Sequence, residues 1–161
     1  MTERARCGLT GCDRSQLGGF CNAHNGGVDE ADMIWNRAAL DDGGASPGAG
    51  DTALAAALAF HGLAMGGGVL DAFERTLGRA TLTEAAFRWL GLEPVAALLA
   101  WVRREIAAGT LGSDDQAEVF EREADERYNA ILPSDAILQA AFRSRLREDP
   151  SAFAGLQDGA T

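Results

Sequence analysis

Residues 93–109 read EPVAALLAWVRREIAAG, and this stretch carries the clearest structural signal of the chain. Pro94 stands where a first helical turn tolerates proline, and Gly109 stands where a helix commonly ends. Between them, apolar side chains recur at the spacing of one helical face, formed by Val95, Leu98, Leu99, Val102 and Ile106. The stretch therefore predicts an amphipathic helix that packs its apolar face against other helices.

The same periodic pattern recurs through most of the chain, whereas strand signals are nearly absent. Each expected helix is bounded by residues that favour a helix end, such as glycine and proline. Besides 93–109, we expect helices at about 29–40, 51–65, 69–77, 81–91, 113–132 and 134–150. The sequence therefore predicts an all-α fold, a compact bundle of about seven short helices in an acidic helical domain over residues 29–161.

Several of these helices begin with residues that can accept a hydrogen bond from the first-turn amides. Asp29 is expected to cap the first helix, Asp51 the second and Ser113 the sixth. Thr81 and Glu84 have the spacing of a capping box at the start of the fourth helix. These assignments predict where the helices begin.

The three cysteines of the chain and one of its two histidines lie close together near the N-terminus. Three thiolates and an imidazole complete the tetrahedral shell that zinc prefers and leave no position open for a substrate. The layout is similar to small zinc knuckles of the form Cys-x4-Cys…Cys-x2-His. We therefore expect residues 1–28 to be a zinc-knuckle-like segment with a structural zinc ion, whose ligands are Cys7, Cys12, Cys21 and His24.

The formal net charge of −10 is unevenly distributed along the chain. Residues 1–28 hold three arginines and two acidic residues, and the remainder holds 11 arginines and 22 acidic residues. The helical body therefore carries a formal charge of −11, which would repel DNA and anionic lipid and attract a basic surface. We expect a basic protein partner, no nucleic acid and no membrane.

The chain contains no lysine. Phosphate-binding P-loops, pyridoxal Schiff bases and kinase-type phosphate sites all require one, so these enzyme classes are excluded. The N-terminus has no apolar signal segment, and the odd number of cysteines argues against a secreted disulfide framework. We expect a cytoplasmic, bacterial protein that is not an enzyme.

Acidic residues gather in two regions of the body. The first is the predicted sixth helix, where we expect the partner to bind Asp114, Asp115, Glu118, Glu121, Asp125 and Glu126. The second lies around the predicted first helix and consists of Asp29, Glu30, Asp32, Asp41, Asp42 and Asp51. The sequence leaves open whether the two groups share one face.

Three parts of the body resemble a known family. They are Gly66–Phe73, Leu90–Leu99, and Asp125–Tyr128 followed by Phe142 and Glu148–Phe153. Together they are similar to the helical DNA-mimic-protein domain. The resemblance implies an all-α acidic domain that, in the member that names the family, is not an enzyme and occupies the DNA-binding face of a transcription factor. The residues that match best, Gly67, Gly68, Phe73, Tyr128 and Phe153, imply a shared fold more directly than shared binding.

Three other functions remain open from the sequence. An immunity or antitoxin protein that neutralises a basic nuclease would use the same electrostatics as a DNA mimic. A nucleic-acid-binding protein would use the arginines of the zinc knuckle, which are Arg4, Arg6 and Arg14. A hydrolase would be centred on His61, the histidine outside the knuckle, and would need Asp71 or Glu74 beside it.

Overall fold

The computed structural model describes residues 29–109 and 112–155. Its regular structure within these residues is entirely helical, which confirms the predicted all-α class. The zinc-knuckle-like segment and its four expected ligands lie outside the described residues. The helices are α1 (Glu30–Leu40), α2 (Ala49–Gly67), α3 (Val69–Arg75), α4 (Ala80–Trp89), α5 (Glu93–Ala108), α6 (Asp114–Ile131) and α7 (Asp135–Glu148), with short 3-10 turns η1 (Leu77–Arg79) and η2 (Pro150–Ala152).

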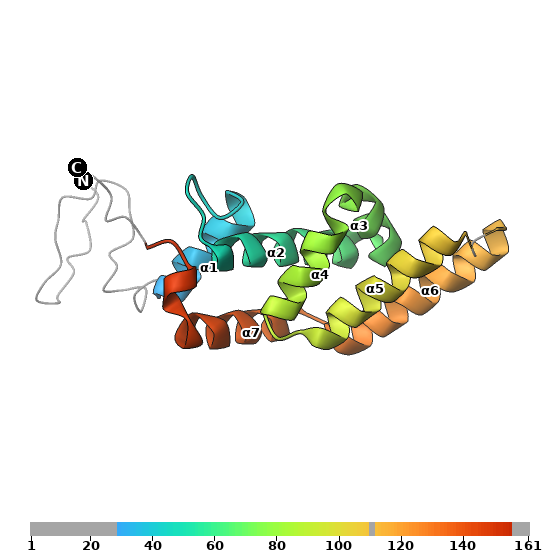
Figure 1. Cartoon of the computed structure of the whole chain (residues 1–161). Helices are drawn as coiled ribbons and strands as arrows, with labels where there is room; N and C mark the ends of the chain where they lie inside the picture. Colours follow the sequence, from blue (N-terminus) through green and yellow to red (C-terminus); the bar gives the residue numbers. More distant parts are fainter. Residues whose placement is uncertain (1–28, 110–111, 156–161) are drawn as a thin grey trace, which may run out of the picture.

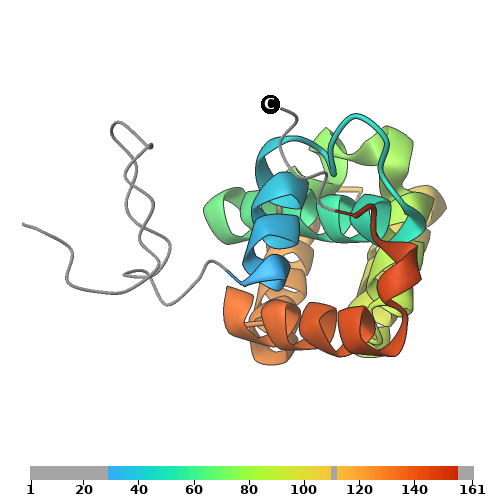
Figure 2. The same cartoon turned by 90° about the vertical axis from the view of Figure 1, so that its left-hand side faces the viewer.

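Helix α2 is the centre of the bundle and packs against α1, α3 and α4. Helix α4 also packs against α5, and α5 pairs with α6 in a helical hairpin that reaches to the end of the molecule opposite α1 (Figure 1). We call this hairpin the α5–α6 arm. At the other end, η2 turns from the end of α7 toward the beginning of α2, which closes the bundle (Figure 2). None of the described helices is both long enough and apolar enough to cross a lipid bilayer.

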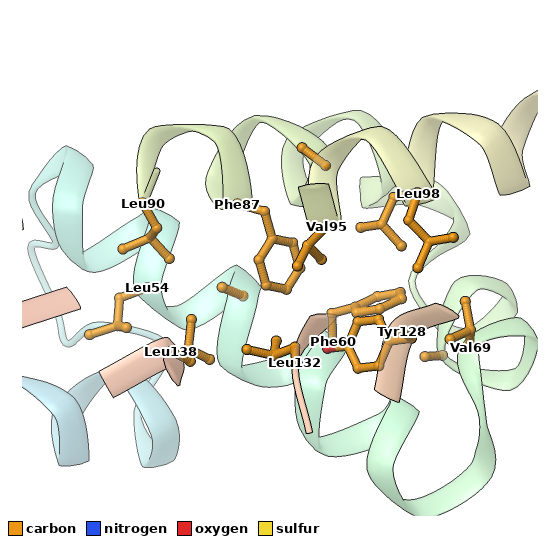
Figure 3. Close-up of a cluster of buried hydrophobic side chains, with 14 of the residues drawn as sticks. Leu54, Phe60, Val69, Phe87, Leu90, Val95, Leu98, Tyr128, Leu132 and Leu138 are labelled. Carbon is orange, nitrogen blue, oxygen red and sulfur yellow. The ribbon is translucent and has the colours of Figure 1, made fainter. Parts of the chain in front are cut away.

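The core is continuous from α1 to the segment after α7 and contains a row of aromatic rings. The ring of Phe60 on α2 meets the edge of Phe87 on α4 at a centroid distance of 6.1 Å and that of Tyr128 on α6 at 5.9 Å (Figure 3). Edge-on pairs of this kind add to the stabilisation from apolar burial. These three side chains therefore join the arm to the centre of the bundle.

The prediction that Asp51 is the N-cap residue of the second helix is wrong. Helix α2 begins at Ala49, with Gly48 as its N-cap, and Asp51 lies within its first turn. The Asp51 carboxylate is fully buried and accepts hydrogen bonds from the Gly48 N–H at 2.9 Å, the Ala154 N–H at 2.6 Å and Arg37 Nη2 at 2.7 Å. Asp51 therefore accepts a bond from the N-cap amide of its own helix and also binds two distant segments, at Arg37 and Ala154.

The capping box predicted for the fourth helix is also wrong. Helix α4 has Arg79 as its N-cap, two residues before the expected Thr81, and no side chain caps it. Glu84 is only 5% exposed and instead binds Arg103 of α5, with Oε1 at 2.6 Å from Nε. A charged partner stabilises a buried carboxylate more than a backbone amide does. The Glu84 side chain therefore pairs with Arg103 and does not cap the helix.

Candidate functional site

The acidic region of the arm lies on α6, which begins as predicted. Ser113 is the N-cap, and its Oγ accepts a hydrogen bond from the Gln116 N–H at 3.3 Å. Asp114 and Asp115 lie in the first turn, where negative charge interacts favourably with the helix dipole. The local sequence is therefore sufficient to start this helix at Asp114.

One face of α6 holds the helix in place. Phe120, Ala124 and Tyr128 are buried on this face. The Phe120 ring lies 4.7 Å from the ring of Trp101 on α5, and the guanidinium of Arg127 lies 4.3 Å from the same indole. Aromatic and cation–π contacts of this kind fix the two helices of the arm side by side.

The outward side of α6 carries the acidic residues. Asp114, Glu118, Glu121 and Asp125 recur at intervals of four, three and four residues, which places them in one row of about 16 Å along the helix. Five exposed carboxylates of α6 form no ion pair with any described residue. They are Asp114, Asp115, Glu118, Glu121 and Glu126. We call these five residues the acidic row: Asp114, Glu118 and Glu121 belong to the repeat above, and Asp115 and Glu126 lie beside it on the exposed side of the helix. Their charge is therefore not neutralised within the described part of the chain.

An apolar side chain lies among these charges. Val119 is 54% exposed and follows Asp115 by one helical turn. An exposed valine between carboxylates gains free energy if a partner covers it, because its apolar surface then leaves water. The helical period could have identified this residue from the sequence, since it falls on the charged face.

Asp125 differs from the other five expected partner-binding residues. Its carboxylate accepts a hydrogen bond from the Val69 N–H at 2.7 Å, and it lies close against Gly68, whose φ of +89° favours glycine. Asp125 therefore caps α3 from another helix and is half-buried. We leave it out of the acidic row because a partner would have to displace this bond.

Replacing Asp125 by alanine is expected to lower the free energy of unfolding by about 1–3 kcal/mol, because the buried Val69 amide loses a charged acceptor. The neighbouring Glu126 is exposed and has no ion pair in the described chain, so Glu126→Ala is the matched control and should change stability by less than about 0.5 kcal/mol. Urea denaturation of both variants measures the difference. Equal stabilities of the two variants would contradict the capping role.

The second acidic group does not extend this surface. Asp29 and Asp32 both bind Arg143 of α7, each at 2.5 Å, and the pKa of Asp29 is lowered chiefly by its hydrogen bond with that guanidinium. Asp51 is buried, as described above. Helix α1 also lies at the opposite end of the molecule from the tip of the arm (Figure 1). The two acidic groups therefore do not form one face.

His61 lies at the junction of three helices and is only 2% exposed. Its Nδ1 is 2.8 Å from the hydroxyl of Tyr128 on α6, and its Nε2 is 3.1 Å from Oδ1 of Asp135 on α7. The Nε2 contact is close enough for charge attraction, but it lacks regular hydrogen-bond geometry. No local pattern around His61 indicates these partners, because both come from distant segments.

The residues expected to assist His61 in a hydrolase do not approach it. Asp71 pairs with Arg75 on its own helix at 3.7 Å, and Glu74 is exposed. Burial lowers the pKa of His61, and the nearby negative charge of Asp135 partly opposes this shift. Burial and the same charge both raise the pKa of the Tyr128 hydroxyl. The neutral forms of both side chains therefore suit a packed core better than a site for proton transfer to a substrate.

Metal-ligating residues do not gather elsewhere in the described residues, where no group of three or more histidine, cysteine, aspartate or glutamate side chains has the geometry for a metal ion. The zinc site at Cys7, Cys12, Cys21 and His24 remains a prediction from the sequence.

No protein-family model matches the chain, and no curated protein and no solved structure matches it. The resemblance to the helical DNA-mimic-protein domain likewise remains a prediction.

Proposed function

We propose that this protein is a non-enzymatic, acidic interaction protein whose α5–α6 arm binds the basic surface of a protein partner. The observation that carries the proposal is the acidic row, in which five exposed carboxylates lack an ion pair within the described chain. Unpaired charges on a projecting helix attract a basic surface over a longer distance than paired ones. Val119, one helical turn after Asp115, supplies exposed apolar area beside these charges.

The partner we propose is a nucleic-acid-binding protein. A surface that binds a phosphate backbone is rich in arginine and lysine, and a row of carboxylates on a rigid helix offers such a surface regularly spaced negative charge. Aromatic contacts hold α5 against α6, and Tyr128 joins α6 to the core. This proposal agrees with the family resemblance and includes a basic nuclease among the possible partners. The predicted zinc ion has a structural role in it.

The test is a triple substitution, Asp114→Asn, Glu118→Gln and Glu121→Gln. We expect it to weaken binding to the partner about tenfold at low salt, because each exposed charge pair contributes roughly 0.5 kcal/mol. The measurement is capture of proteins from a lysate by the immobilised chain, followed by titration of the captured partner at increasing salt.

The matched control removes the same number of charges at the other end of the molecule. It combines Glu30→Gln, Asp41→Asn and Asp42→Asn, all exposed residues without an ion pair among the described ones. This control should bind as the unmodified chain does. If both triple variants lose binding equally, net charge alone explains the attraction, and the proposed role of the arm is wrong. A gel shift of DNA or RNA by the unmodified chain would instead favour the zinc knuckle as a nucleic-acid-binding element.

A further inference from the structure

The buried contact of His61 links the arm to the rest of the bundle. His61 is on α2, Tyr128 is on the buried face of α6, and Asp135 is in the first turn of α7. One imidazole ring therefore touches the two helices that meet at the base of the arm. A change in the protonation of the ring therefore acts on its hydrogen bond with Tyr128 of α6 and on its charge interaction with Asp135 of α7.

The positions of the partners indicate where the hydrogen atoms lie when His61 is neutral. The carboxylate of Asp135 faces Nε2, so the tautomer with hydrogen on Nε2 is favoured, because a lone pair there would face negative charge. Nδ1 is then an acceptor, and the Tyr128 hydroxyl donates to it over 2.8 Å. This arrangement gives the buried hydroxyl the acceptor that it needs.

Protonation reverses this hydrogen bond. A proton on Nδ1 turns that atom into a donor, and the Tyr128 oxygen must then accept. The hydroxyl hydrogen of Tyr128 loses its acceptor and stays buried, since the tyrosine is 1% exposed. A buried donor without an acceptor is unfavourable, so protonation at this site opposes the packing of α6 on α2.

We propose that His61, Tyr128 and Asp135 form an acid-sensitive latch: proton uptake by His61 loosens the C-terminal half of α6 and the first turn of α7 from α2. This inference goes beyond the proposed function, since it concerns how the arm is held and does not depend on what the arm binds. Because α6 also carries the acidic row, the latch makes the position of that row dependent on pH.

The charges around His61 set the direction of this effect. The carboxylate of Asp135 faces the ring from α7, and the hydroxyl of Tyr128 faces it from α6. On the other helices packed against α2, Asp71 of α3 is bound to Arg75, Glu84 of α4 is bound to Arg103, and Glu74 of α3 is exposed. Burial is therefore the largest influence and lowers the pKa of His61 below 6.5.

The sign of the pH dependence follows from this shift. Above about pH 6.5 His61 is neutral in both the closed and the opened state, and the latch is at full strength. As the pH falls below that value, the opened state binds a proton before the closed state does. The equilibrium constant for opening then rises by up to tenfold per pH unit, until the pKa of the closed state is reached.

Hydrogen exchange on the full chain tests the latch. After correction for intrinsic exchange rates, amides in the second half of α6 and the start of α7 should open more readily at about pH 5.5 than at about pH 7.5. The amides of α1 provide an internal reference and should change much less. In the variant His61→Gln, which has no titrating group at this position, the difference between the two pH values should disappear.

NMR titration of the His61 ring is a second measurement that does not depend on that variant folding. We expect a pKa below 6.5 in the unmodified chain, and a still lower one in Asp135→Asn, because the attraction to the carboxylate is lost. Asp135 has a side chain that is 76% exposed, so its substitution should leave the fold intact. A His61 pKa of 6.5 or above, or an equal change of exchange in all helices, would overturn the latch.

Discussion

Replacing Asp51 by alanine is expected to lower the free energy of unfolding by about 3–5 kcal/mol. The carboxylate is fully buried and accepts hydrogen bonds from Arg37 and from the backbone amides of Gly48 and Ala154. Alanine leaves the guanidinium of Arg37, which is only 19% exposed, without its charged partner. It also removes the acceptor of both amides, so three donors lose their bonds together.

Urea denaturation measures this effect, and Asp41→Ala is the matched control. Asp41 is an exposed aspartate in the loop that precedes α2, and the described residues contain no ion pair for its side chain. Its substitution should change stability by less than about 0.5 kcal/mol. A loss below about 1 kcal/mol in Asp51→Ala would mean that this buried pair contributes little to the fold. Since domains of this kind are stable by only about 5–15 kcal/mol, the expected loss is a large share of the total.

The second large effect is expected at Phe60, whose replacement by alanine should also cost about 3–5 kcal/mol. Phe60 is 1% exposed and contacts the rings of both Phe87 and Tyr128, so its loss leaves a cavity where α2, α4 and α6 meet (Figure 3). Leu40→Ala removes apolar atoms from a side chain that is 85% exposed and serves as the control, with an expected change below about 0.5 kcal/mol.

The midpoint of urea denaturation again provides the measurement, and the urea dependence of unfolding should stay unchanged if both variants unfold in one step. A loss at Phe60 no larger than the loss at Leu40 would contradict the assignment of this ring to the centre of the core.

Local sequence signals predicted the helices well where the decisive contacts are also local. The apolar period of residues 93–109 predicted α5, and Asp29 and Ser113 cap α1 and α6 as expected, since a cap needs only an amide two or three residues away. The same type of signal was wrong at Asp51 and Glu84. Both carboxylates are buried and bound by arginines from other helices, which no local pattern reveals.

The same distinction applies to the candidate site. The row on α6 could be predicted because helical periodicity alone places its carboxylates on one side. The roles of Asp125 and of the acids on α1 could not, because the Val69 amide and Arg143 reach them only in the folded chain. The partners of His61 were missed for the same reason.

The contact of Asp51 and Arg37 with Ala154, two residues after η2, has a consequence for sequence variation. Ala154 is bound through its N–H by Asp51 and through its carbonyl by Arg37, so both interactions recognise the main chain and neither involves the methyl group. Position 154 should therefore accept many residue types. The number of residues between Phe142 and Ala154 is a stricter requirement. Phe153 packs on the Phe142 ring, so one inserted residue would place a different peptide unit between Asp51 and Arg37. We expect related sequences to keep the length of this segment even where the residue at position 154 differs.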